Sequence, residues 1–131
     1  MTESELKART KQFALRCITL VDALPRKVSG EVLGKQLLRS STSVGANYRS
    51  ACRAKSSPDF VSKLSIVEEE ADESEYWLEL IRDAKLMKAS LIEPLRQEAN
   101  ELTAIFTASI KTVRRNSQGT PHRRSNPKSK I

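Results

Sequence analysis

Hydrophobic residues recur along the chain at steps of three and four, the spacing that places side chains on one side of an α-helix. The clearest run lies in residues 57–88, and its inward positions are Phe60, Leu64, Val67, Ala71, Ser74, Leu78 and Ile81. Ser57, Pro58 and Asp59 open it with a capping hydroxyl, a proline at the first helical position and an acid in the first turn. At 1.5 Å per residue such a helix is about 45 Å long, which suits a helical bundle.

One helix is predicted at the start of the chain and another near its end. The first is capped by Thr2, which has the spacing of a capping box with Glu5, and it ends before Pro25 because proline cannot continue a helix. The last begins within residues 90–93, and its apolar stripe ends near Arg115.

A further helix is predicted to end near Cys52. Ser29 is expected to cap it, with Val28 and Leu33 forming a hydrophobic staple across the cap. Residues 40–46 are rich in serine and contain glycine, a composition that on propensity alone favours a loop. The apolar spacing continues on both sides, so we interpret this stretch as helix whose small side chains let a neighbouring helix approach closely or let this one bend.

Four helices joined by short links predict an all-α protein, and an up-and-down antiparallel four-helix bundle is the simplest topology. The bundle is expected to occupy residues 1–115. Residues 116–131 contain glycine, two prolines and no apolar period, so they are predicted to form a disordered basic C-terminal tail.

A second apolar stripe in residues 57–88 is rotated by roughly 90–120° from the inward positions. Its members are Trp77, Leu80, Ala84 and Met87, bordered by Tyr76. A bundle helix with two neighbours can have such a broad apolar face. Tryptophan and tyrosine are, however, favoured in subunit interfaces, so we predict that these five residues form an oligomer interface.

Asn47 lies at the edge of an inward stripe, beside Val44 and Ala51. It is either a partly solvated helical residue or a buried amide that bonds to the facing helix. In the second role, which we predict, it would determine which helix lies opposite and in which register.

Charge is distributed unevenly along a chain whose formal net charge is +7. Residues 66–83 contain eight acids against one base, and residues 25–57 contain seven bases against one acid. These two segments can meet between copies in a closed ring, pair inside one bundle, or simply face solvent.

The composition excludes several classes of protein. Only four glycines occur, which argues against a turn-rich β fold and against a phosphate-cradling loop. The charged start MTESELKARTKQ is unlike a signal peptide, and no apolar stretch approaches the eighteen or so residues that span a bilayer. We expect a soluble cytoplasmic protein without a membrane partner.

Catalytic, metal and cofactor sites are not expected. Cys17 and Cys52 belong to separate helices, on or beside apolar stripes, where a free cysteine behaves as a small buried hydrophobe. His122 is the only histidine and lies in the tail, so neither a Cys/His zinc site nor a di-iron site with Glu-x-x-His motifs can be built.

Basic residues near the C-terminus are a candidate nucleic-acid contact. They are Arg114, Arg115, Arg123, Arg124, Lys128 and Lys130. Their contacts with phosphates would be nonspecific and salt-sensitive, because no aromatic platform or base-reading motif accompanies them. The alternative is a basic tail that only increases solubility.

Two stretches are similar to a known family: RSSTSVGANYRSACRAKSSPDFVSKLSIVEEEADESEYWLELI in residues 39–81 and EPLRQEANELTAIFTASIK in residues 93–111. Across about residues 5–115 the chain resembles the four-helix-bundle proteins named after open reading frames in intervening sequences of bacterial 23S rRNA genes. The most specific motifs are Val44 to Tyr48, Phe60, and Glu70-Ala71-Asp72-Glu73. Many members have proline where this chain has Gly45, so a proline kink is not assumed.

The resemblance implies a homopentamer of bundles without known enzymatic activity. The family also includes the accessory variability determinants of diversity-generating retroelements, basic pentamers that bind a reverse transcriptase and nucleic acid. The acidic residues 66–83 depart from a uniformly basic accessory subunit. We therefore expect a non-enzymatic, homo-oligomeric scaffold or interaction module, with a nucleic-acid-binding accessory subunit of a reverse transcriptase as the alternative.

Overall fold

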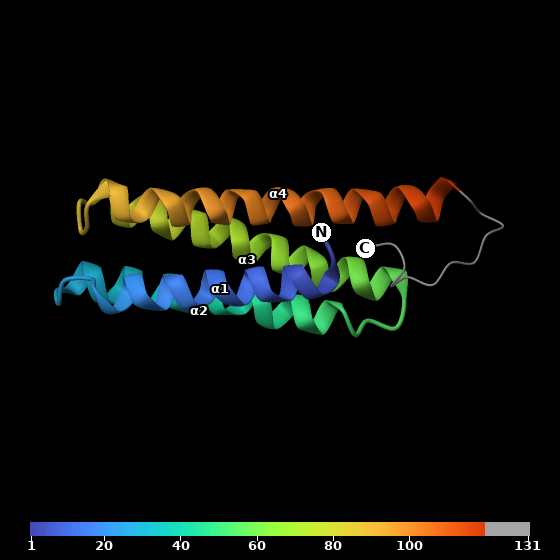
Figure 1. Ribbon diagram of the computed structural model, residues 1–131, viewed down its shortest axis with the longest axis horizontal. Coiled ribbons are helices and arrows are strands. Elements are labelled where there is room, and N and C mark those ends of the chain that lie inside the picture. The colour runs from blue at the N-terminus through green and yellow to red at the C-terminus, as the bar shows by residue number, and fades with distance from the viewer. Residues whose placement is uncertain (120–131) are drawn as a thin grey trace.

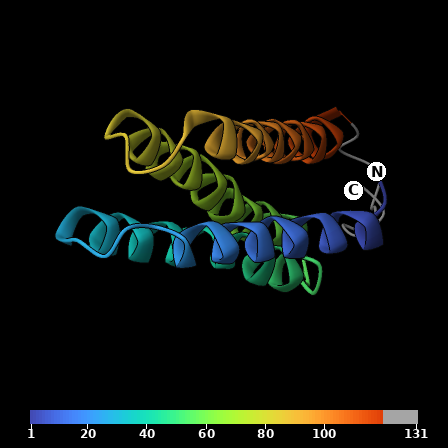
Figure 2. The same cartoon turned by 60° about the vertical axis from the view of Figure 1, so that its left-hand side comes forward.

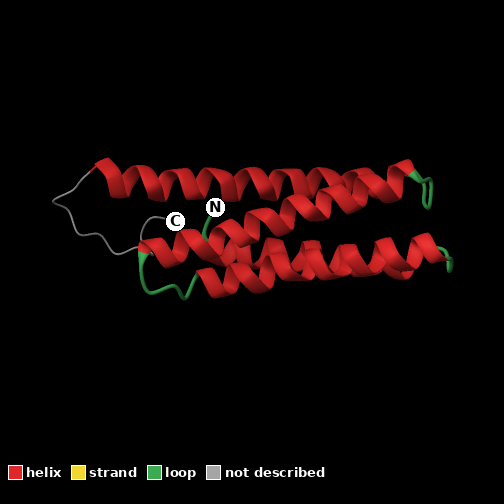
Figure 3. Ribbon diagram, turned by 180° about the vertical axis from the view of Figure 1, so that it is seen from behind, coloured by secondary structure: helices red, strands yellow, loops and turns green. Residues whose placement is uncertain are grey.

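The computed structural model describes residues 1–119, which form four α-helices joined by three short links (Figure 1). They are α1 (Glu3–Asp22), α2 (Val28–Ala51), α3 (Ser57–Asp83) and α4 (Ala89–Gly119). Successive helices run in opposite directions, and this part of the chain contains only helices, turns and loops (Figure 3). The predicted all-α, up-and-down antiparallel four-helix bundle is confirmed.

Helix α1 begins as the sequence predicts. The Thr2 hydroxyl accepts a hydrogen bond from the backbone N–H of Glu5 at 3.0 Å, and the backbone N–H of Thr2 donates to the Glu5 carboxylate at 3.2 Å. This reciprocal pair satisfies two backbone donors at the helix start. The helix ends at Asp22, before Pro25.

Helix α2 begins at Val28, one residue before the predicted cap at Ser29. Lys27 occupies the cap position and makes no side-chain capping bond. The backbone N–H of Lys27 donates to the Pro25 carbonyl at 2.9 Å, and this tight turn starts the helix early. Val28 is 79% exposed, so the predicted hydrophobic staple with Leu33 is wrong.

The serine-rich residues 40–46 are helical, as the apolar spacing predicts. Their hydroxyls donate hydrogen bonds to backbone carbonyls one turn earlier, as the Ser43 hydroxyl does to the Arg39 carbonyl at 2.7 Å. The backbone hydrogen bonds of the helix continue through this stretch. Gly45 lies against α1, where a Cβ would be 3.2 Å from the Thr10 hydroxyl oxygen. The predicted close approach of a neighbouring helix at these small residues is confirmed.

Helix α3 begins and ends at positions other than those predicted. The hydroxyl of Ser56, rather than Ser57, accepts the capping hydrogen bond from the backbone N–H of Asp59 at 3.2 Å. The helix ends at Asp83, well before the predicted end at Lys88.

Lys85 causes this early end because its φ of 58° lies in the left-handed region. Its backbone N–H donates to the Arg82 carbonyl at 3.0 Å, and the N–H of Leu86 donates to the Ile81 carbonyl at 3.2 Å. These two bonds form a Schellman motif, which satisfies the last carbonyls of the helix. The apolar pattern conceals the end because Leu86 is buried and continues it.

Helix α4 begins at Ala89, just before the predicted window of residues 90–93. Pro94 therefore lies inside the second turn rather than at the first helical position. The helix continues to Gly119, so the predicted boundary at residue 115 falls inside it. The rest of the predicted tail, residues 120–131, lies outside the described residues.

All four helices contribute large side chains to one core. Phe13 of α1, Tyr48 of α2, Phe60 of α3 and Phe106 of α4 are almost completely buried. The rings of Tyr48 and Phe106 meet with centroids 5.6 Å apart. Burial of this apolar surface is the main force that holds the helices together.

Helix α3 is the central element of the bundle. It packs along both α2 and α4, whereas α1 packs mainly on α2 and touches α4 over a short stretch. α3 crosses from the side of α2, near its own start, to the side of α4, near the α3–α4 link (Figures 1 and 2). At the end that holds the α1–α2 and α3–α4 links, α3 and α4 therefore stand away from α1 and α2.

Candidate functional site

Tyr76 and Leu80 form the outward part of the interface predicted on α3. The Tyr76 side chain is 52% exposed, and its ring meets that of Trp77 at a steep angle with centroids 5.2 Å apart. Trp77 itself is only partly exposed and packs against the core, and its buried indole N–H has no hydrogen-bond partner among residues 1–119. Trp77 therefore also contributes to the bundle interior.

Ala84 and Met87 do not continue this stripe as a helix face, because α3 ends at Asp83. Ala84 is the exposed C-cap residue. Met87 lies in the link, where it is partly buried and packs against the core. The predicted five-residue interface is thus divided by the end of the helix.

The acidic side chains of α3 bond to both neighbouring helices. Arg39 of α2 pairs with Glu70 at 3.3 Å and also with Glu73. These bonds raise the pKa of Arg39, chiefly through the hydrogen bond to Glu73. Part of the acidic run therefore pairs with the basic segment inside one bundle, one of the arrangements that the sequence left open.

Glu75 is a buried acid between α3 and α4. It accepts hydrogen bonds from Arg96 at 2.6 Å and from Asn100 at 3.3 Å. A buried carboxylate is costly unless it is paired, so these bonds hold α3 and α4 in one register. Sequence reasoning did not identify this cluster, because the residues that pair across two helices depend on how those helices pack.

Some acids of α3 make no ion pair with any residue that the structure describes. Among them are Asp72, which is exposed, and Glu79, which is partly exposed. At 100° per residue, both lie within about 100° of Tyr76 and Leu80 around the helix. We call Asp72, Tyr76, Glu79 and Leu80 the outer face of α3. It combines an apolar body with two carboxylates that have no ion-pair partner in residues 1–119.

Asn47 is partly buried, and its amide bonds within its own helix. The side-chain N–H donates to the Ser43 carbonyl at 2.8 Å, so the hydrogen bond expected toward a facing helix is not made by this residue. A bond between α2 and α3 is made instead by Ser74, whose hydroxyl donates to that of Ser40 at 2.9 Å. Both serines are buried at inward positions.

Unpaired bases gather at the end of the bundle where α2 and α4 end (Figure 1). Arg49, Arg53, Arg114 and Arg115 are exposed there and form no ion pair with an acid in residues 1–119. The remaining predicted nucleic-acid contacts are Arg123, Arg124, Lys128 and Lys130. These four lie outside the described residues.

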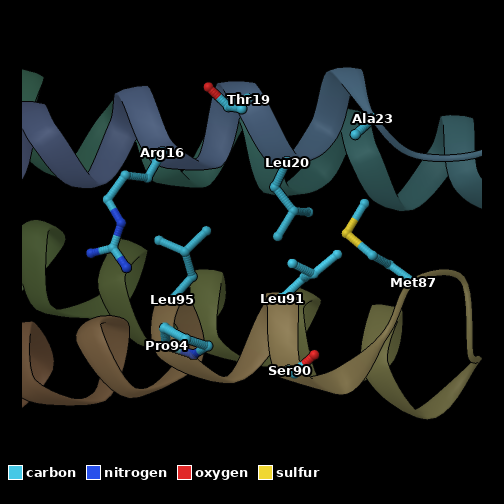
Figure 4. A pocket seen from close by; sticks show the side chains of 9 residues that line it. All are labelled: Arg16, Thr19, Leu20, Ala23, Met87, Ser90, Leu91, Pro94 and Leu95. Atoms are coloured by element: carbon cyan, nitrogen blue, oxygen red, sulfur yellow. The ribbon is translucent and has the colours of Figure 1, made fainter.

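A groove between α1 and α4 was not anticipated from the sequence. Its volume is about 500 Å³, and Leu20, Leu91 and Leu95 form its apolar walls. Met87 also lines it, and Arg16 extends from α1 toward α4 at its edge (Figure 4). Leu91 is 59% exposed, which is unusual for a large aliphatic side chain that faces another helix.

The family model of the 23S rRNA-intervening sequence protein matches residues 2–108. The chain belongs to this family. A crystal structure of a protein of unknown function from the S23 ribosomal protein family of Bacteroides thetaiotaomicron VPI-5482 is 37% identical, with a TM-score of 0.78. The match covers 86% of this chain and 100% of that chain. No curated protein matched the sequence.

The cysteines of this 23S rRNA-intervening sequence protein are free and buried, as predicted. Burial raises the pKa of the Cys17 thiol to about 12 and also raises the pKa of Cys52. Such thiols stay protonated at neutral pH and are poor nucleophiles.

Residues 1–119 contain neither a metal-binding cluster nor a membrane-spanning helix. No group of three or more histidine, cysteine, aspartate or glutamate side chains in these residues is arranged to hold a metal ion. None of the described helices combines the length and the apolar character needed to cross a bilayer.

Proposed function

We propose that this family member is a non-enzymatic scaffold or interaction module of the cytoplasm whose copies assemble into a ring. The observation that supports self-assembly is the outer face of α3, where Tyr76 is half-exposed on a helix whose inward side is already filled. Free buried thiols are typical of a reducing compartment. The family resemblance makes five copies the expected ring size.

The mass of the protein in solution tests this function. We expect light scattering to give a mass near five times the 14.7 kDa of one chain. The double substitution Tyr76→Ser with Leu80→Ser should lower that mass while the helical circular dichroism is retained. Val32→Ser is the control, because Val32 is exposed to a similar extent on α2. A wild-type protein with the mass of one chain would disprove self-assembly.

A second candidate is a nucleic-acid-binding accessory subunit of a reverse transcriptase. The observation that favours it is the set of unpaired arginines at one end of the bundle, among them Arg114 and Arg115. A ring of parallel copies would place all of these bases on one side, where they would act together on a polyanion.

Fluorescence polarisation with a labelled single-stranded RNA separates the two functions. On the second function, binding weakens steeply with salt, and Arg114→Gln with Arg115→Gln weakens it at least tenfold at constant salt. Arg26→Gln with Lys27→Gln removes the same charge from the opposite end of the bundle and is the control. If the protein does not bind the RNA at 50 mM salt, or if both double variants lose the same affinity, RNA binding by the arginines at this end of the bundle is excluded.

A further inference from the structure

The contact between α1 and α4 includes an ion pair near the middle of α1. Arg9 binds Glu98 through two guanidinium nitrogens and both carboxylate oxygens, at 2.8 and 2.7 Å, and reaches Glu101 at 3.2 Å. A bidentate pair of this kind is specific in geometry and holds the two helices at one level.

Seven residues further along α1, an arginine again faces α4, but α4 has no acid at the corresponding positions. Arg16 follows Arg9 by two turns on the same side of α1. Because α1 and α4 are antiparallel, the corresponding residues of α4 lie seven positions before Glu98 and Glu101, and these are Leu91 and Pro94. Arg16 forms no ion pair with any acid that the structure describes, although it is partly buried.

The unpaired arginine lies at the edge of the groove between α1 and α4. Leu20 and Leu91 extend toward each other from the two helices, and Arg16 lies beside Leu95 (Figure 4). An occupant that suits this groove must present apolar side chains to the leucines and a carboxylate to the guanidinium.

The outer face of α3 has both of these features. Tyr76 and Leu80 supply the apolar surface, and Asp72 and Glu79 supply carboxylates without an ion-pair partner in residues 1–119. Within one copy this face cannot reach the groove, because it lies on the side of α3 opposite the core and α3 does not pack along α1. A second copy can supply it.

The two surfaces also lie at the same level of the bundle. Helices α1 and α3 run in the same direction, and both end near the α1–α2 and α3–α4 links (Figure 1). Arg16 and Leu20 belong to the last part of α1, as Tyr76 and Leu80 belong to the last part of α3. Copies that stand side by side with parallel axes therefore bring one surface against the other.

We propose that the groove between α1 and α4 receives the outer face of α3 from a second copy, with Arg16 paired to a carboxylate of that face. This inference rests on the self-assembly proposed above and assigns its two surfaces. The surfaces lie on different sides of each copy, so the contact is heterologous and each copy uses both. Repetition of such a contact closes a ring when the rotation from one copy to the next divides a full turn into a whole number of steps.

Variants of the groove test this assignment. Arg16→Glu and Leu91→Asp should each reduce the mass from that of the ring to that of one chain, because each places a negative charge opposite the neighbour's carboxylates. Leu91 is mostly exposed, so its substitution should leave the fold and the helical circular dichroism unchanged. Leu15→Asp is the control, since Leu15 is 47% exposed on α1 and does not line the groove.

Mixing two defective variants tests the pairing itself. Leu91→Asp has a damaged groove and an intact outer face, and Tyr76→Ser with Leu80→Ser has the reverse. An equimolar mixture can form one contact only, so it should show twice the mass of one chain, although neither variant associates alone. Restoration of this kind cannot arise if both substitutions damage the same surface.

The possible failures have different meanings. If the wild-type protein has the mass of one chain, self-assembly itself is disproved, and this inference with it. If the wild-type protein forms a ring and both groove variants keep its mass, self-assembly stands and the groove is excluded as the acceptor. If the groove variants dissociate but the mixture gives no doubled mass, the pairing of groove with outer face is excluded.

Discussion

Gly30 allows a backbone contact that a side chain would prevent. A Cβ at this position would lie 2.3 Å from the Pro25 carbonyl oxygen, which belongs to the turn that starts α2. At Gly45 a Cβ would meet the Thr10 hydroxyl oxygen at 3.2 Å, and a side chain can adjust by a few tenths of an ångström more easily than a backbone. Two glycines in one helix therefore differ in what they tolerate.

Alanine substitutions should reveal this difference. We expect Gly30→Ala to lower the free energy of unfolding by about 1–3 kcal/mol, the usual cost of overpacking. Gly45→Ala should change it by less than about 1 kcal/mol, because the gain in helix propensity offsets the tight contact. Urea unfolding measures both, and equal effects would contradict the assignment of the clash to the Pro25 carbonyl.

The Cys17 thiol should make the folded state sensitive to alkali. Burial raises its pKa to about 12 from an ordinary value of 9.0, so the unfolded chain loses this proton first. The stability that depends on the protonated thiol is complete below pH 9 and is lost progressively as the pH rises toward the pKa of the folded state.

Urea unfolding at pH 8 and pH 10.5 tests this expectation. The free energy of unfolding should fall between the two conditions, and it should fall less in Cys17→Ala, which has no thiol to ionise. The comparison is made within each protein, so the cavity left by the substitution cancels. An identical decrease in both proteins would show that Cys17 is not responsible.

At the scale of the element, the end of α3 is built on a residue in an unfavourable conformation. Lys85 has a φ of 58°, which for a residue with a Cβ costs more than it does for glycine. Glycine is the common residue at this position of a Schellman motif.

Lys85→Gly should therefore raise the free energy of unfolding by about 0.5–1 kcal/mol, net of the entropy that glycine adds to the unfolded chain. Lys88→Gly is the matched control, because Lys88 is in the same link and has no positive φ. Thermal or urea unfolding measures both. Stabilisation by the control, or destabilisation by Lys85→Gly, would contradict this explanation.

The helix ends also show where sequence reasoning stops. The capping box of Thr2 and Glu5 was predictable because both of its bonds are made within four residues. Ser56 and Ser57 are adjacent and chemically equal, so only the backbone conformation decides which one caps α3. Leu86 lies in the link but continues the apolar period of α3. The period alone therefore cannot distinguish a buried residue of the link from a further turn of the helix.

At the scale of the whole molecule, α3 packs against two helices, α2 and α4, whereas α1 packs mainly against α2. Hydrogen exchange should follow this difference, since amides in segments with many buried contacts open with the highest free energy. We expect the slowest exchange in the middle of α3, around Ala71, and faster exchange in α1 beyond Arg9. Mass spectrometry of peptic peptides measures this order, and protection of α1 equal to that of α3 would contradict it.

The sequence by itself determined that the chain forms helices and which side of each helix faces inward. Both depend on a period of 3.6 residues, which is local and readable from spacing. Phe13, Tyr48, Phe60 and Phe106 were therefore assignable to a core without knowledge of their neighbours.

Only the tertiary structure decided which polar groups meet. The bonds of Glu75 to Arg96, of Arg9 to Glu98 and of Ser74 to Ser40 each depend on which helices are adjacent and at what level they cross. The opening beside Arg16 depends on the same geometry, because its walls come from both α1 and α4. Distances between helices are set by packing of the entire core, and no local pattern encodes them.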